Sequence, residues 1–242
     1  QPENKQELKK ILKNYDSDFF VVIAYGMILD TEILSMPKYY AINVHGSLLP
    51  KYRGASPIQE SLLHGDRETG ISVIKMDEKM DHGKILLIRR INIAENDNFE
   101  TLSAKLSKIS AEILPHLLKD LEEGRLTTIS QEKNKASYCK KIKKSDGAIS
   151  WNASAEKIKN MVRAYTPWPS AYTEIKNKKI KILEAEILDE KLVPGKFIVD
   201  KKILKIGTKQ GVLLPKKVQL EGKNPTDIQS FINGNRDFLN NL

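Results

Sequence analysis

The stretch that decides the fold runs from Tyr40 to Gln59 and reads YAINVHGSLLPKYRGASPIQ. Its left part alternates with a period of two, which predicts a strand that carries Asn43 and His45 on one face. The Gly-Ser-Leu-Leu-Pro run after this strand predicts a turn, and Ser56 followed by proline predicts the start of a helix. An amide and an imidazole are therefore expected where a strand leads through a loop into a helix. Open α/β sheets bind their ligands at such places.

Strands and helices alternate on either side of this stretch, over lengths typical of an α/β domain. The expected fold class is Rossmann-like, with a parallel-rich sheet and helices on both faces. The expected strands are 18–24, 40–45, 70–76 and 84–93, and the expected helices are 4–15, 31–36, 56–65 and 99–123.

The character of the chain changes after Arg125. Residues 126–144 are polar, show no period, and carry several lysines but no acid from Lys133 onward, so we expect a basic linker there. From residue 145 a helix capped by Ser154 is followed by short strands with turn residues between them, which predicts a small β-barrel. The expected organisation is a first domain at 1–125, the linker at 126–144 and a second domain at 145–242.

The composition is that of a folded protein, with 40% hydrophobic and 29% charged residues among 242. No apolar run approaches the roughly 20 residues of a membrane span and no signal peptide opens the chain, so we expect a cytoplasmic protein with no membrane partner. The single cysteine, Cys139, excludes an intramolecular disulfide and a cysteine-based zinc site. The chain opens at Gln1 with a helix, whereas a doubly wound sheet opens with a strand. We therefore expect an N-terminal portion to be missing from this sequence.

The net charge of +9 has two interpretations. Lysine outnumbers arginine by 33 to 7, which fits a generally lysine-rich composition as well as it fits an anionic partner. The charge by itself leaves both a nucleic-acid partner and a solvated basic surface open.

Asn43, His45 and Asp81 are the candidate catalytic residues. Asn43 can donate a hydrogen bond to a developing oxyanion, and His45 can donate one as well or move a proton. A carboxylate against His45 would fix its tautomer and favour its protonated form. Asp81 follows the next strand, and strand ends at one edge of a parallel sheet lie together. The simpler alternative is that all three residues only shape their turns.

Other kinds of chemistry have less support in the sequence. No serine or cysteine lies in an obvious nucleophile elbow, so direct acyl transfer onto an external amine fits better than a covalent enzyme intermediate. The glycines at 46, 54 and 83 form neither a dinucleotide-binding nor a P-loop pattern. We expect no metal site.

The central stretch resembles the signature of the folate-dependent formyltransferases, in NVHGSLLP at 43–50 and YRGA-x-PIQ at 52–59. The resemblance covers essentially the whole chain. It extends through residues 24–26, 76–83, 138, 149–151 and 163–169. Within the family, the chain is most similar to the branch that formylates initiator methionyl-tRNA for translation initiation. The resemblance implies a partial formyltransferase domain followed by an OB-like β-barrel domain.

The resemblance also implies a reaction, in which a formyl group passes from 10-formyltetrahydrofolate to an amine. Asn43 would hold the formyl oxygen, His45 would share its charge, and Asp81 would orient His45 and help to relay a proton. The implied folate-binding residues are Ser47, Leu48, Leu49, Pro50, Tyr25, Gly26, Met27, Ile28, Met76 and Asp77.

Contact with initiator methionyl-tRNA is implied for Arg53, Lys141 and Lys144, because phosphate binding needs only such positive charges. A monomer is expected. Three alternatives stay open: a sugar-nucleotide N-formyltransferase, a formyltetrahydrofolate hydrolase of the same fold, and a non-catalytic tRNA-binding relic.

Overall fold

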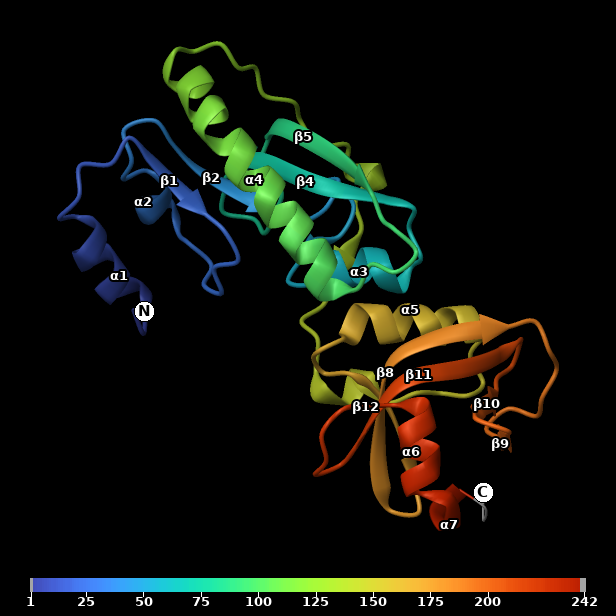
Figure 1. Ribbon diagram of the computed structural model, residues 1–242. Coiled ribbons are helices and arrows are strands. Elements are labelled where there is room, and N and C mark those ends of the chain that lie inside the picture. The colour runs from blue at the N-terminus through green and yellow to red at the C-terminus, as the bar shows by residue number, and fades with distance from the viewer. Residues whose placement is uncertain (1, 240–242) are drawn as a thin grey trace. The chain divides into compact units, whose positions relative to one another are not determined.

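The computed structural model describes residues 2–239, and its ribbon is drawn in Figure 1. The described residues form two compact units. The first holds most of the chain up to Lys141, and the second holds residues 142 onward together with the short segments 59–66 and 94–102. Gln1 and residues 240–242, at the ends of the two predicted domains, lie outside the described residues. The change of unit at Lys141 falls inside the predicted linker.

The first unit is built on a four-stranded sheet in the order β1-β2-β4-β5. β1 (Phe19–Val22) and β2 (Tyr40–His45) pair in parallel, as predicted. β4 (Glu68–Lys75) is antiparallel to both β2 and β5 (Ile85–Asn92). The α/β class is confirmed, but β4 departs from the parallel arrangement, because it runs opposite to β1, β2 and β5. The loop of residues 76–84 joins β4 to β5 as a hairpin, and a hairpin pairs its strands antiparallel.

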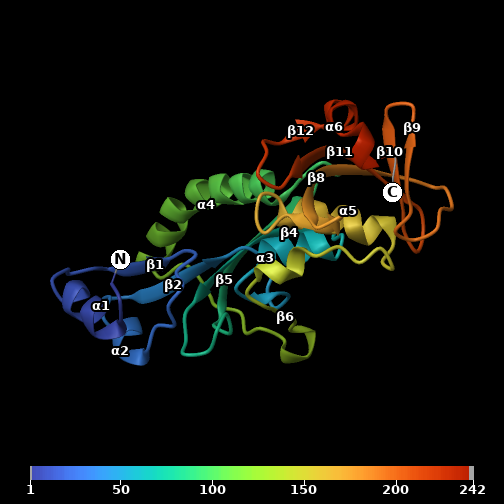
Figure 2. The ribbon, with the colours of Figure 1, turned by 90° about the horizontal axis from the view of Figure 1, so that it is seen from below.

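Two short helices lie beside β1 in both Figure 1 and Figure 2. α1 (Lys5–Leu12) is capped by Asn4 and α2 (Thr31–Leu34) by Asp30, and each capping side chain accepts a hydrogen bond from a backbone amide in the first turn. The apolar side chains buried in this region form one cluster of Leu8, Leu29 and Ile33.

Two further helices agree with the sequence prediction. α3 is Pro57–Leu63 and α4 is Phe99–Glu122, which runs through Pro115 as one helix. The helical period places the buried leucines of α4 on one face. These include Leu106, Leu117 and Leu121.

The predicted linker is more ordered than its sequence indicates. Ile129 exchanges two backbone hydrogen bonds of 2.8 Å with Ile85 at the start of β5. Further along, β6 (Tyr138–Cys139) pairs in parallel with β3 (Arg53–Gly54). The linker also contains a 3₁₀ turn, η1 (Lys133–Lys135), and a second one, η2 (Lys144–Gly147), begins at its last residue. The segment is polar and aperiodic because it is held by backbone and polar contacts to the first unit, so it buries little apolar surface of its own.

The second unit contains a six-stranded antiparallel sheet in the order β7-β8-β11-β10-β9, with β12 added beside β11. An antiparallel second domain is thus confirmed, and closure into a barrel is not part of the strand pairing among residues 2–239. The strands are β7 (Ala171–Ile175), β8 (Lys178–Leu188), β9 (Phe197–Asp200), β10 (Ile203–Gly207), β11 (Val212–Leu220) and β12 (Thr226–Asp227). The helices are α5 (Ala155–Tyr165), α6 (Ile228–Gly234) and α7 (Arg236–Leu239).

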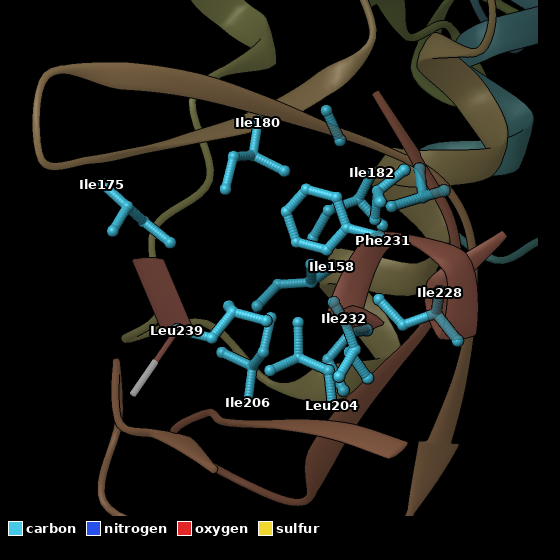
Figure 3. Close-up of a cluster of buried hydrophobic side chains, with 14 residues drawn as sticks. Ile158, Ile175, Ile180, Ile182, Leu204, Ile206, Ile228, Phe231, Ile232 and Leu239 are labelled. Atoms are coloured by element: carbon cyan, nitrogen blue, oxygen red, sulfur yellow. The ribbon is translucent and has the colours of Figure 1, made fainter. Parts of the chain in front are cut away.

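Side chains from these strands and helices form one buried cluster, and Figure 3 shows them pointing toward one another. Ile158 comes from α5, Phe231 from α6, and Ile182 from β8. The helices therefore pack against the sheet through apolar contacts. No helix of the described residues is long and apolar enough to cross a membrane.

The cluster predicts a clear difference between two isoleucines of this sheet. Ile182 is 1% exposed and Ile203 is 49% exposed. Ile182→Ala removes buried methyl groups and is expected to lower the free energy of unfolding by about 2–5 kcal/mol. The control Ile203→Ala should change it by no more than about 0.5 kcal/mol. Urea unfolding followed by tryptophan fluorescence measures both, and equal midpoints would contradict the assigned core.

Candidate active site

Asn43 and His45 lie at the carboxyl end of β2, on one face of the strand. His45 is 5% exposed and Asn43 is half-buried. The strand continues directly into the loop of residues 46–52, which turns back over its end. The imidazole is therefore enclosed by the chain that follows it.

The carboxylate of Asp81 joins these two side chains. Its Oδ1 accepts a hydrogen bond of 3.1 Å from Asn43 Nδ2 and lies 3.6 Å from His45 Nδ1. Its Oδ2 accepts a hydrogen bond of 2.8 Å from the backbone N–H of Gly54. The structure thus brings the three predicted catalytic residues together, with the Asp81 side chain only 12% exposed.

The parallel strand ends expected from the sequence do not explain how Asp81 reaches this position. β4 runs antiparallel to β2, so its last residue, Lys75, pairs with Ile42 and not with the end of β2. The loop of residues 76–84 must therefore turn back toward His45. It does so through a left-handed residue at Asp81, with φ +51°, and through Gly83. A Cβ at Gly83 would lie 1.9 Å from the Lys75 carbonyl oxygen, so only glycine fits there.

The contacts of His45 define its tautomer. Nε2 lies 2.9 Å from the carbonyl oxygen of Tyr52, which can only accept, so Nε2 carries hydrogen and Nδ1 faces Asp81. Burial lowers the pKa of His45 below its ordinary value of 6.5, although the Asp81 charge and the Tyr52 carbonyl act in the opposite direction. The Asp81 carboxylate favours the protonated ring, in the direction expected from the sequence, but burial outweighs it and the pKa is lowered overall. A neutral imidazole is suited to accept a proton.

The loop after His45 contains the predicted residues Ser47, Leu48, Leu49 and Pro50. Ser47 is fully buried, and its Oγ donates to the Lys51 carbonyl at 2.6 Å. The hydroxyl of Ser72 on β4 accepts from the Leu49 amide at 3.0 Å and donates to the Ser47 carbonyl at 2.7 Å. These bonds fix the loop to the sheet.

The other predicted folate residues divide into two groups. Tyr25, Met27 and Met76 pack against the cluster of Leu8, Leu29 and Ile33, and the buried Oη of Tyr25 has no hydrogen-bond partner among the described residues. The remaining three residues are exposed, and the Asp77 carboxylate pairs with His82 at 2.9 Å. These three are Gly26, Ile28 and Asp77.

The structure corrects the prediction that Arg53 contacts nucleic acid. Arg53 is 2% exposed, and its guanidinium donates to Gln131 Oε1 and to Tyr138 Oη. It cannot reach a phosphate without leaving these partners. Lys141 and Lys144 are exposed, and they belong to different units.

Sequence reasoning missed two contributors to the site. One is the backbone N–H of Gly54, which has φ +121° and whose Cβ would lie 2.3 Å from the Cys139 carbonyl oxygen. The other is Gln131, which donates to the carbonyls of Asp81 and Gly83. The presence of Gly54 in the central motif indicated a close backbone contact there. A single glutamine in an aperiodic segment gave no indication that Gln131 contributes to the site. The described residues contain no group of three side chains that could hold a metal ion.

Two family models match the chain. The model described as Formyl transferase matches residues 1–118, and the model described as Formyl transferase, C-terminal domain, matches residues 141–236. The chain is 43% identical over 239 residues to a methionyl-tRNA formyltransferase of Thermodesulfovibrio yellowstonii. That alignment covers 98% of this chain and 77% of the relative.

Solved structures agree with the family models. The methionyl-tRNA formyltransferase from Clostridium thermocellum is similar with a TM-score of 0.63 and 25% identity, over 85% of each chain. HypX from Aquifex aeolicus, in complex with tetrahydrofolic acid, is similar with a TM-score of 0.71 and 15% identity. This second likeness covers 95% of this chain and 40% of that one, and it concerns the fold alone.

The site predicts how His45 titrates. Because burial lowers the pKa of the ring, His45 should be neutral at pH 7 and should titrate below 6.5. Asp81→Asn removes the charge that raises this pKa, so the pKa should fall further in the variant. NMR titration of the imidazole C–H signals, assigned with His45→Ala, measures both values. A pKa above 6.5 in the unaltered protein, or a rise in Asp81→Asn, would contradict this geometry.

Proposed function

The chain belongs to the methionyl-tRNA formyltransferase family, and from this premise we propose how its residues transfer a formyl group from 10-formyltetrahydrofolate to methionyl-tRNA. The observation that carries the proposal is the convergence of Asn43, His45 and Asp81 at the end of β2. The family membership covers both units of the chain. The alternatives of a sugar-nucleotide formyltransferase, a hydrolase or a non-catalytic relic are not favoured, because a relative at 43% identity is a methionyl-tRNA formyltransferase.

We assign the oxyanion to Asn43. The amine of the methionyl group attacks the formyl carbon, and a C–N bond forms while negative charge develops on the formyl oxygen. An amide has two N–H groups. One N–H of Asn43 is directed at Asp81, which fixes the amide plane, and the other would donate to the formyl oxygen as its charge grows.

His45 and Asp81 would move the proton. The attacking amine loses one proton when the new amide forms, and N10 of the departing tetrahydrofolate gains one as the old C–N bond breaks, so the transfer is balanced. The Nδ1 edge of His45, next to Asp81, would take this proton and return it to the leaving nitrogen. Burial helps, because a ring that is neutral at pH 7 can accept the proton.

The substrates would approach from different elements. The loop of Ser47, Leu48, Leu49 and Pro50, rigidly tied to β4, would contact the folate together with the residues around Tyr25 and Met76. The exposed Lys141 and Lys144 would contact tRNA phosphates as point charges. We further propose that the protein is a monomer and acts in the cytoplasm, where charged initiator tRNA is used.

The assignment of Asn43 and His45 predicts large losses of activity. Asn43→Ala removes the oxyanion donor and should lower kcat about 10²–10³-fold. His45→Ala removes the proton carrier and should lower it about 10²–10⁴-fold. The control His116→Ala, on the exposed face of α4, should leave kcat unchanged. Formylation of charged initiator tRNA measures all three, and equal rates would remove the catalytic assignment.

The assignment of the two lysines predicts a change in salt dependence. Replacing both Lys141 and Lys144 with alanine should raise KM for tRNA and reduce the slope of log affinity against log salt by about one per lysine. The control pair, Lys108→Ala with Lys119→Ala, removes two exposed lysines from α4 and should leave the slope unchanged. The measurement is tRNA affinity across a salt series. Identical slopes for the two double variants would argue against the assignment of Lys141 and Lys144.

A further inference from the structure

Gln131 connects a buried arginine to the loop that presents Asp81. Its Nε2 donates to the carbonyl oxygens of Asp81 and Gly83, at 2.9 and 2.7 Å. Its Oε1 accepts from Nε and Nη2 of Arg53, at 3.1 and 2.7 Å. The Gln131 amide thus donates to the Asp81 loop and accepts from Arg53 at the same time.

Arg53 holds this amide in one orientation. Nε and Nη2 of Arg53 both donate to Oε1 of Gln131, and Nη1 donates to Tyr138 Oη at 3.3 Å. A buried guanidinium needs acceptors, so it favours the rotamer of Gln131 that turns Oε1 toward it. The amide nitrogen then necessarily faces the carbonyls of the Asp81 loop.

The backbone on either side of Gln131 is also fixed. Ile129 is bridged to Ile85 at the start of β5. Ser137 donates its amide to the Pro50 carbonyl at 3.2 Å and accepts from the Arg53 amide at 2.9 Å. Its hydroxyl accepts from the Tyr52 amide at 2.9 Å. The segment of residues 129–139, which we call the strap, is therefore attached to β5 and to the loop that follows His45.

We propose that Gln131 is a positioning residue for the active site: by holding the backbone at Asp81 and Gly83, it keeps the Asp81 carboxylate against Asn43 and His45. Arg53 holds the Gln131 amide by donating to its Oε1, and the backbone hydrogen bonds of the strap fix the position of Gln131. The proposal rests on the proposed function and deepens it, because it assigns a role in the reaction to a segment that the sequence shows only as a polar linker.

The chemistry of the amide explains why glutamine is required. The Arg53 side needs an acceptor and the loop side needs a donor, and an amide is the side chain of this length that supplies both. Glutamate at this position would satisfy Arg53 at least as well. Its second oxygen, however, would face the two carbonyl oxygens of Asp81 and Gly83 and repel them. Gln131→Glu therefore breaks the connection to Asp81 and keeps the one to Arg53, whose guanidinium pairs with the added charge.

The charged and titratable groups around His45 come from three elements. Asp81 faces Nδ1 from the loop after β4. On the Nε2 side, the Tyr52 carbonyl also accepts from the Cys139 thiol of β6 at 3.4 Å, and the Arg53 guanidinium follows in β3. Gln131 hydrogen-bonds both the Asp81 backbone and the Arg53 guanidinium, and of these two residues Asp81 is the one whose charge faces Nδ1 of His45. A loosened Asp81 loop should consequently lower the pKa of His45, because the carboxylate raises it.

The test compares Gln131→Glu with the unaltered full chain. We expect kcat for formylation to fall about 10–100-fold, as when a supporting hydrogen bond next to a reacting group is lost, with KM for 10-formyltetrahydrofolate within about twofold. The NMR pKa of His45 should fall, and the acid limb of the pH–rate profile should move to lower pH. The control Glu132→Gln changes the neighbouring exposed residue, whose carboxylate pairs with Lys135, and should behave as the unaltered chain.

Arg53→Lys tests the same connection from the other side, because lysine keeps the charge and loses the fork. It should lower both kcat and the pKa of His45 in the same directions, and it replaces Gln131→Glu if that variant does not fold. An unchanged His45 pKa and pH profile in the folded variants, with or without a loss of kcat, would overturn the positioning role. The NMR shift is independent of turnover. A shift without formylation in the unaltered chain would therefore keep the positioning role and contradict the proposed function.

Discussion

The site depends on one carboxylate that accepts hydrogen bonds from two separate parts of the chain. The Asp81 carboxylate accepts hydrogen bonds from the side-chain amide of Asn43 on β2 and from the backbone N–H of Gly54 on β3. It also faces the ring of His45. A carboxylate that is 12% exposed is stable only where donors replace water, and the surrounding loops supply those donors. The strand end and the two loops are thereby held around a single charge.

This arrangement also sets the electrostatics of the site. The imidazole is enclosed deeply enough for burial to dominate its pKa, and the nearby carboxylate reduces that effect without reversing it. His45 therefore stays neutral while remaining next to a group that stabilises its protonated form. Such a balance suits a residue that takes up a proton in one step and releases it in the next.

Hydrogen bonds between polar groups also fix the chain around the site. Arg53, Gln131 and the carbonyls of Asp81 and Gly83 form a continuous series of hydrogen bonds, in which each member limits the rotamers of the next. A fully satisfied polar series of this kind specifies one geometry more strictly than apolar contacts do. Such hydrogen bonds can therefore fix the position of a segment that has no apolar period as firmly as sheet pairing fixes a strand.

The sequence by itself determined the α/β class, the bounds of most strands and helices, and the neighbouring positions of Asn43 and His45. Period, caps and turn residues are local signals, and they act within a few residues. Only the tertiary structure decided that β4 is antiparallel, that the loop of Asp81 turns back to His45, and that Arg53 is buried against Gln131. These outcomes depend on contacts between residues that are 27 to 78 positions apart, from the His45–Ser72 pair to the Arg53–Gln131 pair. No local pattern records which distant partner a residue will meet.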